Sequence, residues 1–437
     1  MKKHTFHYTL AALLLLTGIL TPSAVAREVA RENERANLAS PPQLSAFINI
    51  YMETSVDNHG PAIAYNSLHD EYLVVWTNTR GGGATKDIYA RRVHGDGTLE
   101  PAVFTIVHDT NFLNYEPDVA YSPAHDEYLV VYTYDNPLTD SDIWARRVSW
   151  NGGWMSPEFA LGRPDKSGRQ QHPAVTYNPD ADQYLVVWEN LWGGSYDIDS
   201  QRVNASDGSP QPYVNVVAGA GYRSFPDVAY CPASNFYLVT YTFQPSSISD
   251  PGDVYGKVAP WDFSYPTPEI HICDDASDQG TAAVAASTEE FLVVWEDATN
   301  VSTTEIYARR LAADGTPQGP GGGFWITGAP NRLDTAPAVA YGRGYGYLIA
   351  WQRYMGGSDA NVYGRYAMPG WDSGVDDEFA LDDDIKLQIE PAVACNTLGD
   401  CLMAEDDNDS IGGDFEIRGR LAWNYHVFLP LTLRNSP

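Results

Sequence analysis

Seven copies of one short motif constrain the fold of this chain more than any other feature of the sequence. The motif, PAIAY at residues 61–65, returns with changes at residues 117–121, 173–177, 226–230, 282–286, 337–341 and 391–395. The first and last copies start 330 residues apart, which gives a mean period of 55 residues over the six intervals. Such a chain is expected to fold as a series of similar units rather than as one irregular core.

Further motifs follow each copy in a fixed order. A second motif, YLVVW at residues 72–76, recurs in varied form at residues 128–132, 184–188, 237–241, 291–295, 347–351 and 401–404. A third, DIYAR at residues 87–91, recurs at residues 142–146, 253–257, 305–309 and 361–365. A turn rich in Asp and Gly then leads to a short apolar run, such as residues 104–106. Four runs rich in β-branched and aromatic residues predict a four-stranded antiparallel sheet in each repeat.

These repeats predict an all-β fold, a seven-bladed β-propeller of four-stranded antiparallel blades. The second motif is apolar throughout, so both faces of its strand should be buried. The last repeat lacks a fourth run, and residues 46–50 supply one, since Phe47 precedes Pro61 by 14 residues, as Phe159 precedes Pro173. We therefore expect the N-terminal strand to complete the last blade and to close the ring, which removes its open edge.

The YLVVW and DIYARRV motifs, with the Asp-Gly turn that follows them, resemble those of secreted bacterial β-propellers and, more loosely, of sialidase-type bladed proteins. The resemblance covers residues 46–422 and implies the fold but no particular activity, because propellers host unrelated functions. The sialidase Asp-box, S-x-D-x-G-x-T-W, is matched only in part, at residues 94–98 and 313–316. An arginine triad with a tyrosine nucleophile cannot be placed on these residues, so sialidase activity is not implied.

The N-terminal segment of the chain indicates export. Residues 1–26 show a charged start, an apolar run and the small-x-small pattern AVA, as a secretory signal peptide does. The apolar run is shorter than the ~20 residues that span a bilayer. Residues 27–45 predict a flexible lead-in, residues 46–422 the propeller, and residues 423–437 a C-terminal tail that is either an edge strand or a sorting signal. We expect a secreted or cell-surface monomer with no membrane span.

Charge excludes two classes of partner. The chain has 57 acidic and 27 basic residues and a formal net charge of −30. Nucleic acids and anionic membranes bind clusters of Lys and Arg, which are missing here, so neither is an expected partner. At 43% hydrophobic residues the chain can bury a large core, which excludes a wholly disordered protein.

Cysteines and acidic runs are the residues to consider for covalent and metal chemistry. Cys395 and Cys401 flank the predicted hairpin of the last repeat, and we expect a disulfide there in an oxidising compartment. Cys231 and Cys273 should not pair with each other. No zinc pattern is present, and we predict no cofactor. Acidic runs at residues 274–275, 382–384 and 406–409 offer oxygens for calcium, but none matches a known calcium loop, so solvent-facing turns are the preferred interpretation.

The third motif pairs an acid with a base four residues later, at residues 87 and 91, 142 and 146, 253 and 257, 305 and 309, and 416 and 420. Residues four apart on a strand share a face. Because the pairs recur around the predicted ring, we expect them to fix turns or to join neighbouring blades. The strand-end aromatic residues, such as Trp76 and Trp188, should likewise pack between blades.

A polar residue stands three positions before each first motif, and these residues are the candidate ligand-binding set: Asn58, Asn114, Gln170, Arg223, Gln279, Asp334 and Gln388. We expect them to ring one mouth of a central channel, where carboxamides suit sugar hydroxyls or peptide groups. Trp192 and Tyr354, on neighbouring loops, would add stacking faces. The alternative is that these side chains cap the backbone of each entering loop, in which case Arg223 and Asp334 are the departures from the pattern.

Two functional hypotheses follow. The first is a non-catalytic binding or scaffold propeller that recognises an extracellular glycan or protein; a purely structural envelope protein is a further variant. The second is a carbohydrate-active hydrolase or lyase that uses carboxylates just after the second strands, for which the candidates are Glu189, Glu296, Asp297 and Glu405. Two carboxyls ~5–10 Å apart across a cleft would favour the enzyme, whereas carboxyls spread around the ring would favour the scaffold.

Overall fold

The structure is a computed structural model in which the described residues form strands and turns. They are residues 42–53, 56–80, 83, 85–109, 112–136, 140–162, 168–192, 194–264, 267–273, 275–300, 303–327, 332–343, 345–356, 359–370, 378–384, 387–408 and 415–423. Over these ranges the fold is all-β without any helix, and hence without one that could cross a membrane. The predicted signal peptide, nearly all of the lead-in and nearly all of the tail lie outside the described residues.

Each sequence repeat forms one antiparallel unit, and we number these units 1 to 7. Unit 1 contains β3 (Asp57–Asn66), β4 (Glu71–Arg80), β5 (Thr85–His94) and β6 (Leu99–Val107). Unit 2 contains β7 (Leu113–Ser122), β8 (Glu127–Asp135), β9 (Ser141–Ser149) and β10 (Phe159–Ala160). Unit 3 contains β11 (Arg169–Asn178), β12 (Gln183–Trp192), β13 (Ser195–Asn204) and β14 (Val214–Val217). Unit 4 contains β15 (Tyr222–Cys231), β16 (Phe236–Gln244), β17 (Asp253–Pro260) and β18 (Ile270–His271).

The remaining units follow the same order. Unit 5 contains β19 (Asp278–Ala286), β20 (Glu290–Asn300), β21 (Thr303–Ala312) and β22 (Phe324–Trp325). Unit 6 contains β23 (Leu333–Gly342), β24 (Gly346–Gly356), β25 (Asp359–Ala367) and β26 (Phe379–Asp382). Unit 7 contains β27 (Leu387–Cys395), β28 (Cys401–Asn408) and β29 (Glu416–Trp423). The fourth strand varies most in length and is only two residues long in units 2, 4 and 5.

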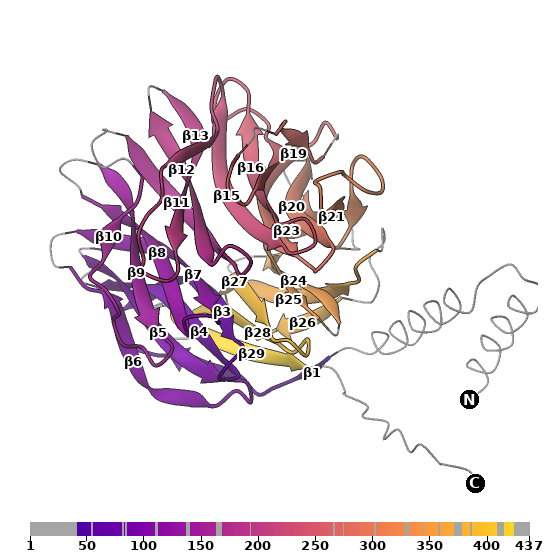
Figure 1. The fold of residues 1–437 in the computed structure, drawn as a ribbon. Helices are drawn as coiled ribbons and strands as arrows, with labels where there is room; N and C mark the ends of the chain where they lie inside the picture. The colour runs from indigo at the N-terminus through magenta and orange to yellow at the C-terminus, as the bar shows by residue number, and fades with distance from the viewer. Residues whose placement is uncertain are drawn as a thin grey trace, which may run out of the picture.

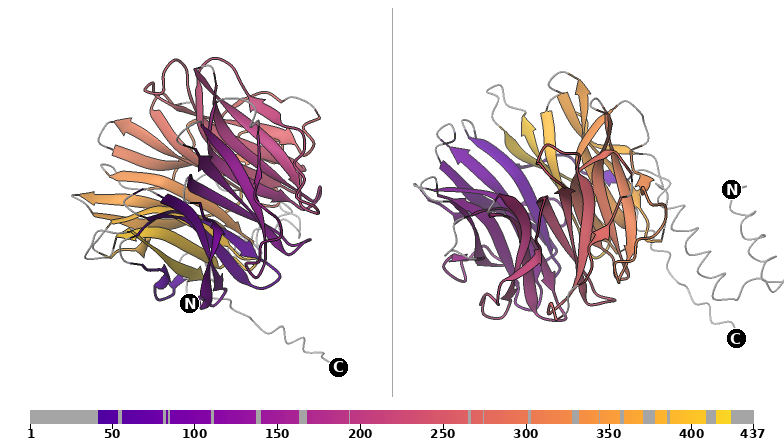
Figure 2. Two further views of the ribbon diagram at one scale, coloured as in Figure 1. Left: turned by 90° about the vertical axis from the view of Figure 1, so that its left-hand side faces the viewer. Right: turned by 90° about the horizontal axis from the view of Figure 1, so that it is seen from above.

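The units lie around a common centre (Figure 1). The first strands of neighbouring units contact one another in the order β3, β7, β11, β15, β19, β23 and β27, and β27 also contacts β3. Figure 2 shows the same sheets from two further directions, with the N-terminal and C-terminal strands side by side.

Second strands form the core, as their apolar sequences predict. Along β4 every residue but the last is buried. Trp76 and Trp188 are fully buried, and each packs in a cluster shared with the preceding unit: Trp76 beside Leu402 of unit 7, and Trp188 beside Val131 of unit 2. The prediction that the strand-end aromatic residues pack between neighbouring repeats is confirmed.

Basic residues of the third strands also join neighbouring units. Each donates a hydrogen bond to a backbone carbonyl in or beside the outer strand of the preceding unit: Arg146 to Ile106, Lys257 to Val216, Arg309 to Ile272, Arg365 to Ile326 and Arg420 to Leu381. The acidic partner fixes the local turn in unit 1, where Asp87 accepts the N–H of Asp109 at 3.1 Å. Both expected roles of the paired charges are therefore present.

The N-terminal strands pair with the last unit. Antiparallel partners of β29 are β1 (Gln43–Leu44) and β2 (Ile48–Tyr51). Arg91 donates to the carbonyl of Ile50 at 2.7 Å, so β2 receives the contact that the outer strands of other units receive. Because β1 begins at Gln43, strand pairing starts inside the predicted lead-in of residues 27–45.

Register within this N-terminal strand differs from the prediction by one residue. Ile48, rather than Phe47, lies opposite Gly419, in the place that Phe159 takes opposite Ala145. The predicted register is wrong because the connection from this strand to β3 is one residue shorter than the connection from β10 to β11. Phe47 instead lies under two guanidinium groups of β29.

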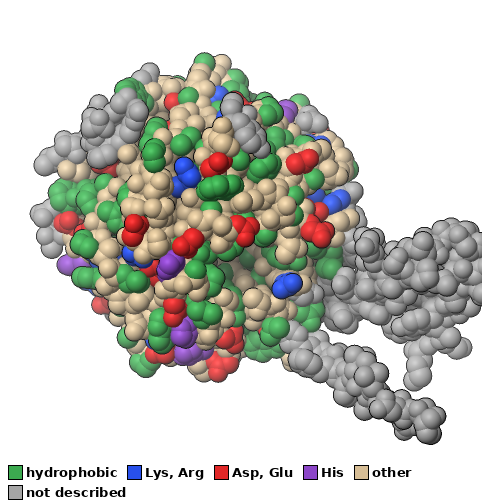
Figure 3. Space-filling view, in the orientation of Figure 1, with side chains coloured by type: hydrophobic (Ala, Val, Ile, Leu, Met, Phe, Trp, Pro, Cys, Tyr) green, Lys and Arg blue, Asp and Glu red, His purple; other side chains and the backbone are tan. Residues whose placement is uncertain are grey.

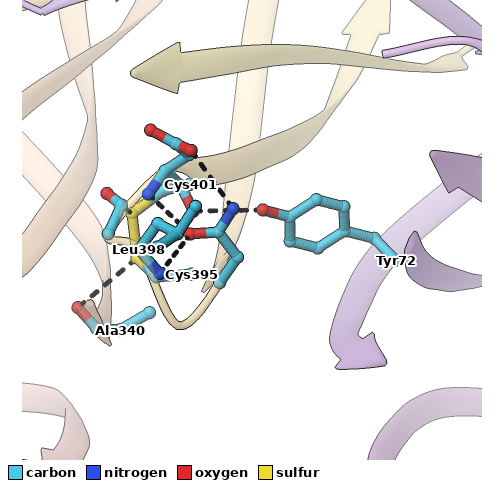
Figure 4. Close-up of a disulfide and its surroundings, with 8 residues drawn as sticks. Tyr72, Ala340, Cys395, Leu398 and Cys401 are labelled. Atoms are coloured by element: carbon cyan, nitrogen blue, oxygen red, sulfur yellow. Dashed lines mark hydrogen bonds between the residues drawn. A yellow bond between two sulfur atoms is a disulfide. The ribbon is translucent and has the colours of Figure 1, made fainter. Parts of the chain in front are cut away.

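The predicted disulfide is present. Cys395 and Cys401 are direct cross-strand neighbours at the hairpin that joins β27 to β28, and they are bonded to each other. Figure 4 shows Tyr72 of unit 1 reaching the same hairpin, where its hydroxyl donates to the carbonyl of Asp400 at 3.0 Å. Cys231 and Cys273 are buried and unbonded to each other, as predicted. A disulfide of this kind fits an oxidising, extracellular compartment.

Candidate ligand-binding site

The first strands surround a central cavity of about 400 Å³ to which all units contribute. Its wall contains, in each unit, the residue just before the proline of the first motif, or before Ala282 in unit 5. We call these the mouth residues: Gly60, Glu116, His172, Phe225, Thr281, Ala336 and Glu390. The backbone is therefore repeated around the cavity while the side chains that face it differ.

Every mouth residue lies at a bulge. The register between the first and second strands shifts there in all seven units, for instance between His59 and Ala62 and between Ser224 and Asp227. Proline has no N–H to give to a ladder, so a proline in an inner strand is tolerated at such a bulge. Six of the seven mouth residues have a left-handed φ of 50–58°, and among these six only Gly60, as a glycine, is free of the associated strain.

Two of the predicted catalytic carboxylates hold the mouth residue of the next unit. Glu296 Oε1 accepts the N–H of Ala336 at 2.7 Å, and Glu189 Oε2 accepts the N–H of Phe225 at 3.3 Å. The same contact is made by Asp406 to Gly60 at 3.1 Å and by Gln352 to Glu390 at 3.0 Å. We call these four side chains the junction acceptors. They belong to units 3, 5, 6 and 7, so these three carboxyls and one carboxamide are distributed around the cavity.

The other two catalytic candidates are buried inside their units. Glu405 occupies the place of Trp76, because Ala404 pairs with Ala392 as Val75 pairs with Ala62. Burial and the neighbouring Asp382 raise the pKa of Glu405 well above its usual range, which favours the protonated acid. Asp297 is 2% exposed, and burial raises its pKa too. None of the four predicted carboxylates is among the residues that line the cavity, and their catalytic role stays a prediction.

A cluster of two carboxylates and an imidazole stands at the mouth. The ring nitrogens of His172 lie 3.0 Å from Glu189 Oε1 and 3.3 Å from Glu116 Oε1. Burial alone would lower the pKa of His172, but the bond to Glu189 and the charge of Glu116 raise it overall. The second oxygen of Glu116 accepts from the backbone N–H of His172 at 3.1 Å and from the Thr133 hydroxyl at 3.0 Å. The cluster is therefore fixed, with Glu116 and His172 still about one-third exposed.

Phe225 stands beside this cluster. Its ring centroid is 4.7 Å from that of His172, and 42% of the residue is exposed. A bulky residue with φ of 51° is uncommon and costs conformational energy, roughly 1 kcal/mol or more. The mouth thus presents an aromatic face next to carboxylates and an imidazole.

Deeper in the wall, two aspartates connect first strands of successive units. Asp118 accepts the N–H groups of Val119 and Val175, at 2.8 and 2.7 Å. Asp227 makes the equivalent pair of bonds to Val228 and Val284. Burial raises the pKa of Asp118 to about 7 and that of Asp227 to about 6, with the charge of Asp227 contributing to the shift at Asp118. Both carboxyls therefore titrate near neutral pH.

The predicted ligand-binding set lies behind the mouth. Asn58, Asn114, Gln170, Arg223, Gln279, Asp334 and Gln388 are each at most 5% exposed. Their contacts agree with the capping alternative only in part. Asn58 accepts from the Trp76 indole at 3.0 Å and donates to the carbonyl of Phe415 in unit 7 at 2.9 Å. Gln279 donates to two carbonyls of its entering loop. Ligand binding by these residues stays a prediction.

The two departures from the polar pattern have local partners. Asp334 makes a bidentate ion pair with Arg353, at 2.6 and 2.9 Å, and Glu378 holds the same guanidinium from the other side. Arg223 lies over the ring of Phe243 at 4.9 Å. In each case this partner, Arg353 or Phe243, is the residue directly across the strand pair. Packing within one unit therefore explains both.

Trp192 and Tyr354 are exposed, at 44% and 38%, but neither lines the cavity. Of the predicted acidic runs, Asp274 and Asp409 lie outside the described residues. Asp382, Asp406 and Asp407 are buried in β26 and β28, so the prediction of solvent-facing turns is wrong for these three. Among the residues that are described, no group of three His, Cys, Asp or Glu side chains is arranged to hold a metal ion. Figure 3 shows acidic side chains scattered over one face of the molecule rather than gathered in one patch.

The mouth residues were missed because their position looks irregular in sequence. The residue before the proline is Gly, Glu, His, Phe, Ala or Glu and so breaks the motif. The usable signal was the proline itself, since a proline inside a buried strand indicates a bulge.

Comparisons with known proteins place the fold. No family model and no curated protein matches the chain. A protein of unknown function from Dyadobacter fermentans has a TM-score of 0.55 at 12% identity, over 88% of this chain and 99% of that chain. A PL25 polysaccharide lyase, an ulvan lyase, has a TM-score of 0.53 at 10% identity, over 86% and 95%. A sialidase from Trypanosoma rangeli has a TM-score of 0.50 at 7% identity, over 87% of this chain and 60% of that chain.

At these identities the likeness shows the fold alone. This chain has a β-propeller fold. Its loose similarity to sialidase-type bladed proteins is a similarity of fold.

Proposed function

We propose that this chain is a secreted, closed seven-bladed propeller that binds an extracellular glycan at the mouth of its central cavity. Closure is supported by the pairing of β2 with β29 and by the bond from Arg91 to Ile50, which repeats the bond between other neighbouring units. The unbroken series of contacts among first strands, from β3 round to β27 and back, supports seven blades. The disulfide supports export.

One observation carries the binding proposal: seven equivalent backbone positions face one cavity with chemically different side chains. An architectural device repeats its side chains, as the basic residues of the third strands do, whereas a ligand surface is asymmetric. Phe225 offers an apolar face for a sugar ring, and Glu116, Glu390 and His172 offer acceptors and a donor for hydroxyl groups. This combination of one stacking face and several polar groups suits a saccharide.

A binding role without catalysis is favoured by how the carboxylates are used. Glu189 and Glu296 accept backbone N–H groups of the following unit, which is a structural task. The junction acceptors come from four units, and this distribution is the one expected of a scaffold. Glycoside hydrolysis would need two carboxyls facing one substrate bond.

A carbohydrate-active hydrolase or lyase is the second candidate, and the cluster at His172 favours it. Glu116 and Glu189 approach opposite nitrogens of one imidazole, so two carboxyls and a titratable base stand at a single place on the mouth. An acid–base pair requires this kind of proximity.

A glycan array combined with a polysaccharide degradation screen tests the proposal on the purified protein. We expect array binding without degradation, and at least tenfold weaker binding for Phe225→Ala and for Glu116→Gln. Trp325→Ala serves as the control, because Trp325 is 52% exposed on β22, away from the cavity wall. Degradation that is lost in His172→Ala would establish the second candidate. Binding that is unchanged in both mouth variants would refute the site.

Phe225→Gly separates function from strain. Glycine adopts a left-handed φ without penalty, so this variant should be about 1 kcal/mol more stable than Phe225→Ala while binding just as poorly. Urea unfolding of the two variants provides the comparison.

A further inference from the structure

A second cavity, of about 720 Å³, lies at the junction of units 1 and 2, outside the central one. Its wall includes Arg80, Tyr89, Phe104, His108, Arg146 and Trp154, together with Glu158. We call it the rim groove. It shares no lining residue with the central cavity, so its chemistry is independent of the mouth.

Trp154 is the most exposed large hydrophobic side chain that the structure describes, at 61%. It is nonetheless fixed from two sides. Its indole N–H donates to the carbonyl of Thr105 in unit 1 at 3.1 Å, and the Arg146 guanidinium of unit 2 lies 4.2 Å from the ring centroid. A fixed and exposed aromatic face is a stacking platform that costs little entropy to use.

Arg146 differs from two equivalent arginines, Arg91 and Arg420, in the use of its Nε. Arg91 Nε donates to the carbonyl of Glu100 in the outer strand β6 at 2.9 Å, and Arg420 Nε donates to the carbonyl of Ser45, between β1 and β2, at 2.8 Å. Arg146 is 7% exposed, and its Nε has no acceptor among the described residues. A buried donor without an acceptor is costly, so an acceptor supplied by a ligand in this groove would be favourable.

The charge of the groove is opposite to that of the molecule. Its lining has two guanidinium groups, those of Arg80 and Arg146, against one carboxylate, Glu158, which the Tyr132 hydroxyl engages at 2.8 Å and which lies 3.7 Å from Arg146. The ring of His108, which also lines the groove, lies 2.7 Å from the carboxylate of Asp87. The whole chain carries a formal charge of −30, so a local excess of cations is conspicuous. At 0.15 M salt the Debye length is ~8 Å, so a ligand in the groove interacts with these cations more than with distant acids.

We propose that the rim groove binds an anionic sugar residue of a polysaccharide. The pyranose ring stacks on the outer face of Trp154, and the carboxylate or sulfate of the sugar lies toward Arg80, His108 and Arg146. Guanidinium groups suit both anions because their planar N–H groups can donate in pairs. The site is distinct from the mouth, and either proposal can fail without the other.

Calorimetric titration at 0.15 M salt tests the proposal on the purified protein. The probes are oligogalacturonate for carboxylate sugars, chondroitin sulfate oligosaccharides for sulfated sugars, and cello-oligosaccharides of matched length as the neutral arm. We expect one or both anionic probes to bind at least tenfold more tightly than the neutral one. We expect Trp154→Ala to weaken that binding at least tenfold.

Matched variants distinguish the groove from other surfaces. Arg80→Gln should weaken the anionic probes and leave neutral binding unchanged, whereas Trp325→Ala and Phe225→Ala should leave anionic binding unchanged. Melting temperatures of all variants exclude misfolding as the cause. Equal binding of neutral and anionic probes, no binding of any anionic probe, or anionic binding that survives Trp154→Ala would overturn the proposal. So would a Trp154-dependent interaction with a protein and none with sugars.

Discussion

Replacing Glu296 tests the role of the junction acceptors. Its Oε1 accepts the Ala336 N–H at 2.7 Å, which links the end of the second strand in unit 5 to the mouth residue of unit 6. Glu296→Ala removes the acceptor and leaves that N–H at a bulge without its partner. Glu296→Gln keeps an acceptor oxygen in the same place.

The size of the effect follows from the bond. A hydrogen bond to a charged acceptor contributes about 1.5–3 kcal/mol, and partial exposure of Glu296 places it toward the lower end, so Glu296→Ala should cost about 2 kcal/mol. Glu296→Gln should cost less than about 1 kcal/mol. An unfolding entropy of about 2.1 cal/mol/K per residue over roughly 380 residues is about 0.8 kcal/mol/K, so the melting temperature of Glu296→Ala should fall by about 2–3 °C.

Scanning calorimetry and amide hydrogen exchange measure this effect globally and locally. We expect faster exchange at the Ala336 amide in Glu296→Ala and near-normal exchange in Glu296→Gln. Equal melting temperatures and equal exchange in the wild type and Glu296→Ala would refute the junction role. Loss of a catalytic activity in Glu296→Gln at unchanged stability would instead establish Glu296 as a catalytic residue.

Three further outcomes are expected. The raised pKa values of Asp118 and Asp227 mean that the fold favours their protonated forms, so stability should fall as the pH rises through about 6 and 7. The double variant Asp118→Asn with Asp227→Asn should flatten this slope in melting curves between pH 5 and 8. Replacing both bridged cysteines by serine should cost about 2 kcal/mol in urea unfolding, because the closed loop is short, and an unchanged midpoint would contradict the bridge. Asp334→Ala should cost about 2 kcal/mol, because it removes one of the two carboxylates that hold the buried Arg353 guanidinium and leaves Glu378, while glycan binding should stay intact; weaker binding at constant stability would place Asp334 in the site.

Sequence repetition was sufficient to predict the strands because each strand carries its own local pattern. The second motif is apolar at every position, and its strand is buried on both faces. Recurrence also identified the basic residues of the third strands as structural, and these residues form hydrogen bonds between neighbouring units. The hairpin disulfide followed from two cysteines at facing strand ends.

Positions that depend on register could not be predicted in the same way. A bulge displaces pairing without changing the motif, so the mouth residues Glu116, His172 and Phe225 were passed over. The second strand of unit 7 lacks the aromatic residue that ends the second motif in the other units. Counting from the end of the motif therefore selected Glu405 as the candidate carboxylate, whereas Asp406 makes the junction contact. The rim groove depends on one irregular loop meeting another unit, and no repeat pattern reports such a contact.

We proposed that the N-terminal strand closes the ring, and one truncation experiment tests this closure. Deleting residues 42–52 removes Ile48 and Ile50, both buried against unit 1 or β29, and takes the Ile50 carbonyl from Arg91. Burial of two such side chains contributes about 3–6 kcal/mol, so the melting temperature should fall by about 4–7 °C or more. Deleting residues 27–41 is the control and should leave it unchanged. Equal melting temperatures for the two truncated proteins and the intact one would contradict closure.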